Sequence, residues 1–158
     1  MMKAEEAGRA IRHVVQEHGD EGTRLGGPAD LESVQWFGRL LGWEWPPSYV
    51  QVLARHDGVV VQDAIVFRFV ESIERFLILH AAWHHPGGFW PVASDGCGNY
   101  FALSLGQRDE AGECPVVFFD MITSAEEPEY TAAADYAEFV RDHLRQQCER
   151  VRCAKPMV

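Results

Sequence analysis

The chain has 158 residues, of which 47% are hydrophobic and 24% are charged, a balance typical of one globular domain. Its formal net charge of −10 argues against direct nucleic-acid binding, which requires clustered Lys and Arg side chains. No apolar run approaches the roughly 20 residues that span a bilayer, and the charged N-terminal stretch lacks the apolar core of a signal peptide. We therefore expect a cytoplasmic protein whose four cysteines are free thiols.

Three helices are predicted in the first third of the chain. Residues 4–18 place apolar side chains at helical spacing, and the Gly- and Asp-rich segment 18–28 is predicted to be a loop. Asp30 is a suitable N-cap for a helix over 31–42 that ends at a glycine. A Pro–Pro pair then suits the first turn of a third helix over 47–57, which Gly58 closes.

The middle of the chain has strand chemistry. Residues 59–70 are β-branched and aromatic and predict one or two short strands, followed by a helix over 72–84. The stretch 89–105, FWPVASDGCGNYFALSL, predicts two strands around DGCGN. CPVVFFD, residues 114–120, predicts another strand, and TSAEEPEYTA, residues 123–132, predicts an acidic loop.

The last helix begins at Asp135, an N-cap that has Glu138 three residues later in a capping-box arrangement. We expect the tail after Cys148 to fray. Helices, then a block of strands, then a helix predict an α+β fold: a single domain with a mixed or antiparallel β-sheet flanked by helices. We divide the chain into an N-terminal helix and loop (1–27), the main domain (28–147) and a C-terminal tail (148–158).

DGCGN can be interpreted as a turn or as a catalytic loop. Gly96 and Gly98 tolerate positive φ, and the side chains of Asp95 and Asn99 can bond to their own backbone. Hairpin chemistry therefore explains every residue of the segment except Cys97, which a catalytic interpretation would make a nucleophile with a nearby His as base. We interpret the segment as a turn.

Three blocks of the chain, in this order, resemble the SUKH superfamily. They are PPSYVQVLARHDG, then FWPVASDGCGNYFALSL, then CPVVFFD followed by DYAEFVRDHL, and the resemblance as a whole covers about residues 30–144. Val52 and Asp57 stand where the family has Phe and Asn, which are mild changes at core and turn positions. The resemblance implies a SUKH-like α+β fold and a binding role. Many bacterial members resemble immunity proteins that neutralise a polymorphic toxin, and fungal relatives resemble regulators of cell-wall assembly.

The favoured hypothesis is therefore a non-catalytic immunity protein, a monomer or weak homodimer, whose partner is a toxin domain such as a basic nuclease. The negative charge would speed association with a basic partner. Exposed Trp side chains are enriched at interface hot spots. The expected partner-binding residues are Trp43, Trp83, Asp120, Glu126, Glu127 and Glu129.

Two alternatives stay open at this point. One is a regulatory scaffold that binds an endogenous protein. The other is a hydrolase that uses the Cys97 thiol, or a metal held by His80 and His84 on one helix face beside His85. The second lacks a HExxH motif and further ligands at recognisable spacing, so we expect no catalytic residues, no metal and no cofactor.

Overall fold

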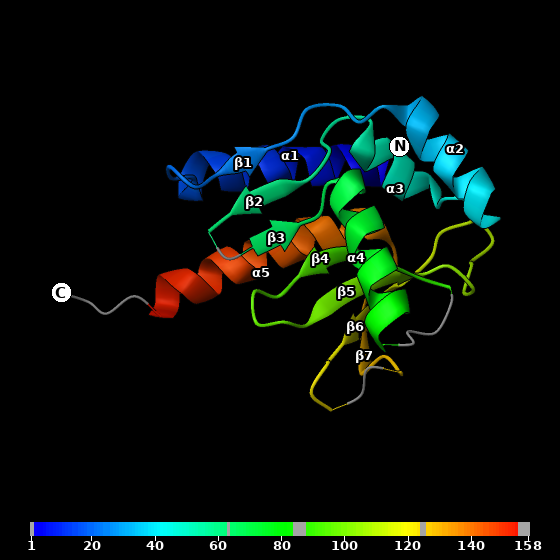
Figure 1. Ribbon diagram of the computed structural model, residues 1–158. Coiled ribbons are helices and arrows are strands. Elements are labelled where there is room, and N and C mark those ends of the chain that lie inside the picture. The colour runs from blue at the N-terminus through cyan, green and yellow to red at the C-terminus, as the bar shows by residue number, and fades with distance from the viewer. Residues whose placement is uncertain (1, 63, 84–87, 124–125, 155–158) are drawn as a thin grey trace.

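The computed structural model describes residues 2–62, 64–83, 88–123 and 126–154, and the side chains of all of these except residues 2, 81–83 and 148–154. Its centre is an antiparallel sheet in which every strand pairs with its neighbours in the sequence, in the order β1-β2-β3-β4-β5-β6-β7 (Figure 1). The strands are β1 (Arg24–Leu25), β2 (Val59–Val61), β3 (Ala64–Val66), β4 (Phe89–Ser94), β5 (Tyr100–Ser104), β6 (Val116–Phe119) and β7 (Tyr130–Ala133). The predicted α+β fold is confirmed.

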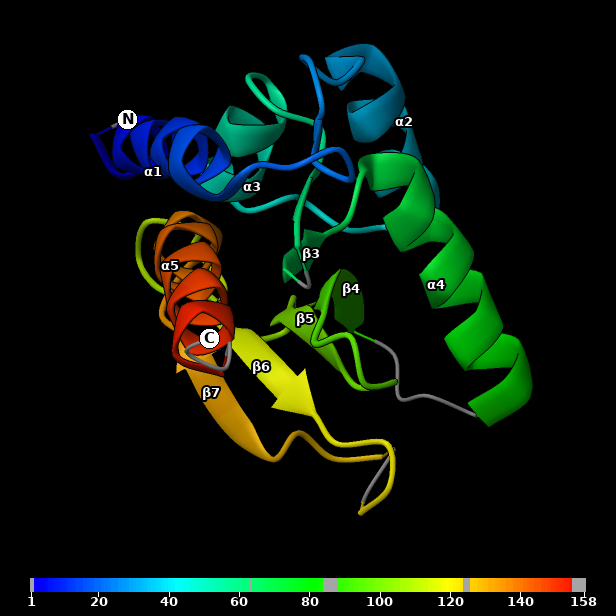
Figure 2. The ribbon, with the colours of Figure 1, turned by 90° about the vertical axis from the view of Figure 1, so that its left-hand side faces the viewer.

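Five helices surround this sheet: α1 (Met2–His18), α2 (Leu31–Leu41), α3 (Pro47–Leu53), α4 (Phe69–Trp83) and α5 (Tyr136–Ala154). Figure 2 shows the sheet between α5 on one side and α4 on the other, with α2 and α3 above it. None of the helices in the described part of the chain is both long enough and apolar enough to cross a membrane.

The central strand β5 shows why the sheet needs helices on both faces. Phe101 packs toward α5, where its ring centroid lies 5.0 Å from that of Phe139. Its neighbours Tyr100 and Ala102 point the other way and form a second apolar cluster with Leu79 of α4. Successive side chains of a strand alternate between the two faces, so a fully buried strand must be covered on both sides.

Aromatic side chains join the helices to the sheet in the larger core. Trp45, in the connection between α2 and α3, is 4% exposed, and its ring centroid lies 4.9 Å from that of Trp90 on β4. The Trp45 indole Nε1 donates a hydrogen bond of 2.8 Å to the Val34 carbonyl of α2. Burial and a satisfied indole donor together fix α2 against the domain.

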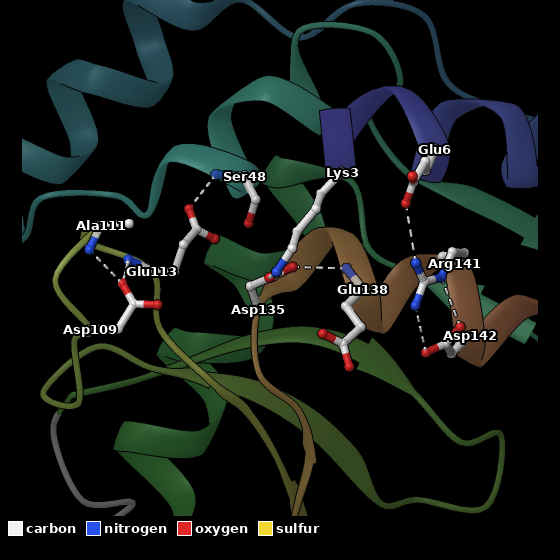
Figure 3. Close-up of polar contacts among 10 residues, drawn as sticks. All are labelled: Lys3, Glu6, Ser48, Asp109, Ala111, Glu113, Asp135, Glu138, Arg141 and Asp142. Atoms are coloured by element: carbon white, nitrogen blue, oxygen red, sulfur yellow. Dashed lines mark hydrogen bonds and ion pairs between the residues drawn. The ribbon is translucent and has the colours of Figure 1, made fainter. Parts of the chain in front are cut away.

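The N-terminal helix is part of the same packed body. Ile11 of α1 is buried in the main core, and α1 runs beside α5 (Figure 2). Two ion pairs tie the helices together at their surface: Lys3 Nζ lies 2.8 Å from Asp135 Oδ2, and Arg141 Nη1 lies 3.2 Å from Glu6 Oε2 (Figure 3). The division of the chain at residue 28 stays a prediction.

Helix boundaries follow the predicted caps in two cases. The Asp30 carboxylate accepts a hydrogen bond from the backbone N–H of Glu32 at the start of α2. The Asp135 carboxylate accepts one from the N–H of Glu138 at the start of α5. α5 continues past Cys148 to Ala154.

Two strands lie in segments predicted to be loops. β1 is only two residues long, and it pairs Leu25 with Val59 across the sheet edge. β7 takes its residues from the end of the predicted acidic loop, and it pairs Thr131 with Val117. Both are short edge strands with mostly exposed side chains, so neither carries the apolar alternation that predicts a strand.

Two helix ends also differ from the prediction. α3 ends at Leu53, and Gly58 lies beyond it, with φ 83° at the entry to β2. α4 begins at Phe69 because a carboxylate distant in the sequence caps it: Asp57 Oδ1 accepts the Phe69 N–H at 2.7 Å. A local pattern cannot reveal a cap that comes from another element.

Candidate protein-binding surface

The DGCGN segment forms the turn of the β4–β5 hairpin, as predicted. The Asp95 carboxylate accepts hydrogen bonds from the backbone N–H groups of Cys97 and Asn99. Gly96 and Gly98 have φ values of 81° and 90°, which residues other than glycine rarely adopt. The Asp95 carboxylate thus serves to stabilise the turn through these hydrogen bonds.

Asn99 connects this turn to the β6–β7 loop. Its side-chain Nδ2 donates to Asp95 at 2.9 Å, and its Oδ1 accepts the backbone N–H of Met121 at 3.0 Å. Met121 is the second residue after β6. One amide side chain therefore holds together two loops that are about twenty residues apart in the sequence.

A groove of about 400 Å³ opens beside these loops, between α4 and the ends of β3, β4 and β5. Its walls are mainly apolar and include Phe67, Leu79, Tyr100 and Met121. Burial raises the pKa of Tyr100, so its phenol is neutral at physiological pH. Arg75 of α4 also lines the groove, and its guanidinium lies 5.5 Å from the Phe67 ring centroid. Such a concave apolar site with few polar groups is typical of a binding site.

One exposed aliphatic side chain lines the groove, and two others directly adjoin lining residues in the sequence. Ile78 of α4 lines it and is 53% exposed, and Leu77 beside it is 57% exposed. Ile122, directly after Met121, is 89% exposed. Exposed aliphatic side chains that adjoin a groove are characteristic of protein-interaction sites, whereas scattered single ones are ordinary surface.

The acidic residues predicted to bind a partner lie mostly in the β6–β7 loop, which leads away from the groove at Met121. Asp120 follows β6 directly, and its Oδ1 accepts the backbone N–H of Ile122 at 2.9 Å. Glu126, Glu127 and Glu129 are exposed in the returning part of the loop. Residues 120–130 contain no Lys or Arg, so the loop is locally anionic.

The two predicted tryptophans lie elsewhere. Trp43 is half-buried in the connection between α2 and α3 and packs on the main core. Trp83 is the last residue of α4, and its side chain lies outside the described part of the chain. The structure thus brings together the four predicted acidic residues but does not place Trp43 with them.

A second concavity, of about 470 Å³, lies between α1 and α5, and it is lined mostly by charged side chains. Arg141 lines this cleft and contacts both Glu6 and Asp142, and the hydrogen bonds that it donates to the Asp142 carboxylate raise the pKa of Arg141 (Figure 3). The Arg141–Glu6 ion pair joins α5 to α1, and Arg9 and Arg145 also line the cleft. We assign this cleft to the attachment of α1 rather than to partner binding.

The predicted alternative chemistries have little support in the geometry. Cys97 is exposed at the tip of the hairpin turn. Within the described residues, no group of three or more His, Cys, Asp or Glu side chains is arranged to hold a metal ion. His84 and His85 lie outside those residues, so that part of the predicted histidine cluster is not described.

Sequence reasoning missed the groove residues Arg75, Ile78 and Met121. A signal was present in FLILH, residues 76–80, where three consecutive aliphatic residues occur in a helix. A helix packed on one face cannot bury three consecutive side chains, so at least one had to be exposed. Which one is exposed, and beside what, depends on the angle at which α4 crosses the sheet.

Comparison with known proteins agrees with the resemblance in the sequence. Residues 28–142 match the model of the SMI1 / KNR4 family (SUKH-1). None of the curated proteins searched matches the chain.

Proposed function

The chain belongs to the SMI1 / KNR4 family (SUKH-1), and from this premise we propose that it is a non-catalytic immunity protein that binds and neutralises a toxin domain. The observation that carries this proposal is the groove between α4 and the sheet, with the exposed Ile78 in its lining and an anionic loop that begins next to its lining residue Met121. An apolar centre with a charged periphery is the usual anatomy of a protein interface.

The proposed mechanism is stoichiometric occlusion. A basic face of the toxin, such as a nuclease groove, would approach the loop that carries Asp120, Glu126, Glu127 and Glu129. Long-range attraction would speed the encounter and select cationic partners. Ile78 and Ile122 would then lose their exposed area on docking, and burial of this apolar surface would stabilise the complex.

The test is co-expression of this protein with the C-terminal toxin domain encoded nearest to its gene. Rescue of growth and a one-to-one complex on size-exclusion chromatography are the expected results. The double variant Ile78→Ser/Ile122→Ser should lose rescue while it keeps the folded stability of the parent, because both side chains are exposed. Leu40→Ser on α2, at another exposed aliphatic position, is the matched control and should retain rescue.

Two outcomes would contradict the proposal. Rescue by the Ile78/Ile122 variant at parental strength would show that the groove is not the interface. Absence of both rescue and complex would favour the second hypothesis, a regulatory scaffold with an endogenous partner.

A further inference from the structure

The groove differs in charge from the loop beside it. Of the described residues that line it, Arg75 alone carries a formal charge at neutral pH. The adjoining loop carries four carboxylates and no cation between residues 120 and 130. A partner that docks here therefore meets negative charge on the adjoining loop and one positive charge, the exposed side chain of Arg75, in the lining of the groove.

Arg75 is held in position by the wall of the groove. Its guanidinium lies over the ring of Phe67, which is 5% exposed and fixed in the core. This cation–π contact orients the group without using its N–H donors on an anion. Two turns earlier on the chain, Arg68 contacts Glu71 at 3.2 Å. Among the described residues no carboxylate lies within ion-pair distance of Arg75. The guanidinium of Arg68 is therefore paired with a carboxylate of the same chain, whereas that of Arg75 is not.

The neutral polar side chains of the groove already form hydrogen bonds within the protein. Ser94 and Asn99 line the groove, together with Gly96 and Gly98 of the hairpin turn. The remaining lining is mainly aliphatic and aromatic. A ligand that complements the apolar lining and Arg75 has an apolar body and an anionic oxygen-bearing end, because guanidinium recognises carboxylates through paired N–H donors.

We propose that the groove binds a segment of the protein partner in which an apolar side chain is followed by a carboxylate, and that Arg75 pairs with this carboxylate. The assignment rests on the proposed function of the groove as a protein-binding surface. Arg75 would also reject a Lys or Arg at the same point of the partner segment, because two like charges would be brought together beside an apolar surface. The acidic loop attracts cationic partners, and Arg75 then selects among them.

The experiment is an NMR titration of the full chain with the peptides acetyl-Ile-Leu-Glu-amide and acetyl-Ile-Leu-Gln-amide, which differ only in the carboxylate. The Glu peptide should shift the amide resonances of Gly96 and Gly98 and the side-chain Nε–H resonance of Arg75. It should bind about 3- to 10-fold more tightly than the Gln peptide, as expected for one partly exposed charge pair. Arg75→Gln should remove this difference. Arg39→Gln, a change at an exposed position of α2, should preserve it.

Three results would overturn the proposal. These are equal affinity for both peptides, a preference that survives in Arg75→Gln, and absence of shifts in the groove. The titration is independent of the toxin, so its failure alongside successful rescue would refute only the role of Arg75. Failure of rescue alongside a selective peptide site would instead refute the immunity function.

Discussion

The indole of Trp90 donates a hydrogen bond of 2.9 Å from its Nε1 to the hydroxyl of Tyr49, and both side chains are almost completely buried. The bond joins β4 to α3, elements that are about forty residues apart in the sequence. It satisfies two polar groups where water has no access.

Tyr49→Phe removes the acceptor and leaves the Trp90 N–H unpaired. We expect the free energy of unfolding to fall by about 1–3 kcal/mol, the usual cost of an unsatisfied buried donor. Urea denaturation followed by tryptophan fluorescence measures this change. Tyr130→Phe, at a side chain that is half exposed, is the control and should change the stability much less. Equal effects of the two substitutions would contradict the importance of the Trp90 bond.

Alkaline pH should destabilise the fold. Burial raises the pKa of Tyr49 and Tyr136 above the ordinary value of 10.0, and the carboxylate of Asp135 raises that of Lys3. Above pH 10 the unfolded chain releases protons that the folded chain retains, so the free energy of unfolding falls as pH rises. Each tyrosine contributes up to about 1.4 kcal/mol per pH unit in this range.

Urea denaturation at a series of pH values between 8 and 11.5 measures this dependence. The titration of these groups should leave the free energy of unfolding nearly unchanged up to about pH 9.5, and this free energy should decline at higher pH. Tyr136→Phe should have a shallower decline than the parent, since one titrating phenol is absent. An unchanged slope would show that Tyr136 does not carry the effect.

Gly38 of α2 is predicted to be intolerant of any side chain. A Cβ atom at this position would lie 2.6 Å from the Trp45 Nε1 and 3.0 Å from the Trp43 carbonyl oxygen. Gly38→Ala should therefore lower the free energy of unfolding by about 1–3 kcal/mol through overpacking, although alanine favours helices.

Gly27→Ala provides the matched control, because nothing lies within 4 Å of the place that its new methyl group would take and its φ is not in the left-handed region. We expect that substitution to be neutral or to stabilise the protein by up to about 1 kcal/mol, since it restricts the unfolded chain. The test is a comparison of the thermal unfolding midpoints of Gly38→Ala and Gly27→Ala, in which Gly38→Ala should unfold at the lower temperature. Similar midpoints would contradict the close approach of Trp45 to α2.

The Asp135 side chain has two roles, as N-cap of α5 and as partner of Lys3. Asp135→Ala removes both, and should destabilise the protein by about 1–3 kcal/mol because it leaves the partly buried N–H of Glu138 at the start of α5 unpaired. Lys3→Met removes only the ion pair and should cost less than about 1 kcal/mol, since the Lys3 side chain is 63% exposed. Guanidinium denaturation of both variants measures the two losses of stability. A larger loss in Lys3→Met than in Asp135→Ala would contradict the greater importance of the N-cap.

Charge on the β6–β7 loop should control the rate of association with a basic partner. The triple variant Glu126→Gln/Glu127→Gln/Glu129→Gln should associate with the toxin roughly ten-fold more slowly at low salt, and its rate should depend less on ionic strength. The dissociation rate should change little, because exposed charges act mainly during the encounter. Stopped-flow mixing at several salt concentrations measures both effects.

The control for total charge is the triple variant Glu17→Gln/Glu21→Gln/Glu32→Gln. These exposed residues belong to α1, to the segment before β1 and to α2. Figure 1 shows these elements on the side of the molecule away from the β6–β7 loop. This variant should retain most of the association rate. Equal slowing in both variants would mean that net charge, rather than the loop, attracts the partner.

Local chemistry made much of the fold predictable. Asp30 and Asp135 cap helices through hydrogen bonds to N–H groups two and three residues later, and Gly96 and Gly98 form a hairpin turn within five residues. Such features depend only on near neighbours, so they can be inferred from a short stretch. β1 and β7 could not be inferred in this way, because exposed edge strands are defined by the strand with which they pair.

For the candidate site, the ingredients can be read from the chain alone: an anionic loop without Lys or Arg, an aliphatic run in α4 and a turn of small residues. Their meeting at one place is a property of the folded arrangement. Asn99 joins the turn to Met121, and α4 crosses the sheet so that Arg75 and Ile78 face the same groove. Contacts between distant segments depend on how helices pack on a sheet, and this packing is set by the whole core at once rather than by any one stretch of residues.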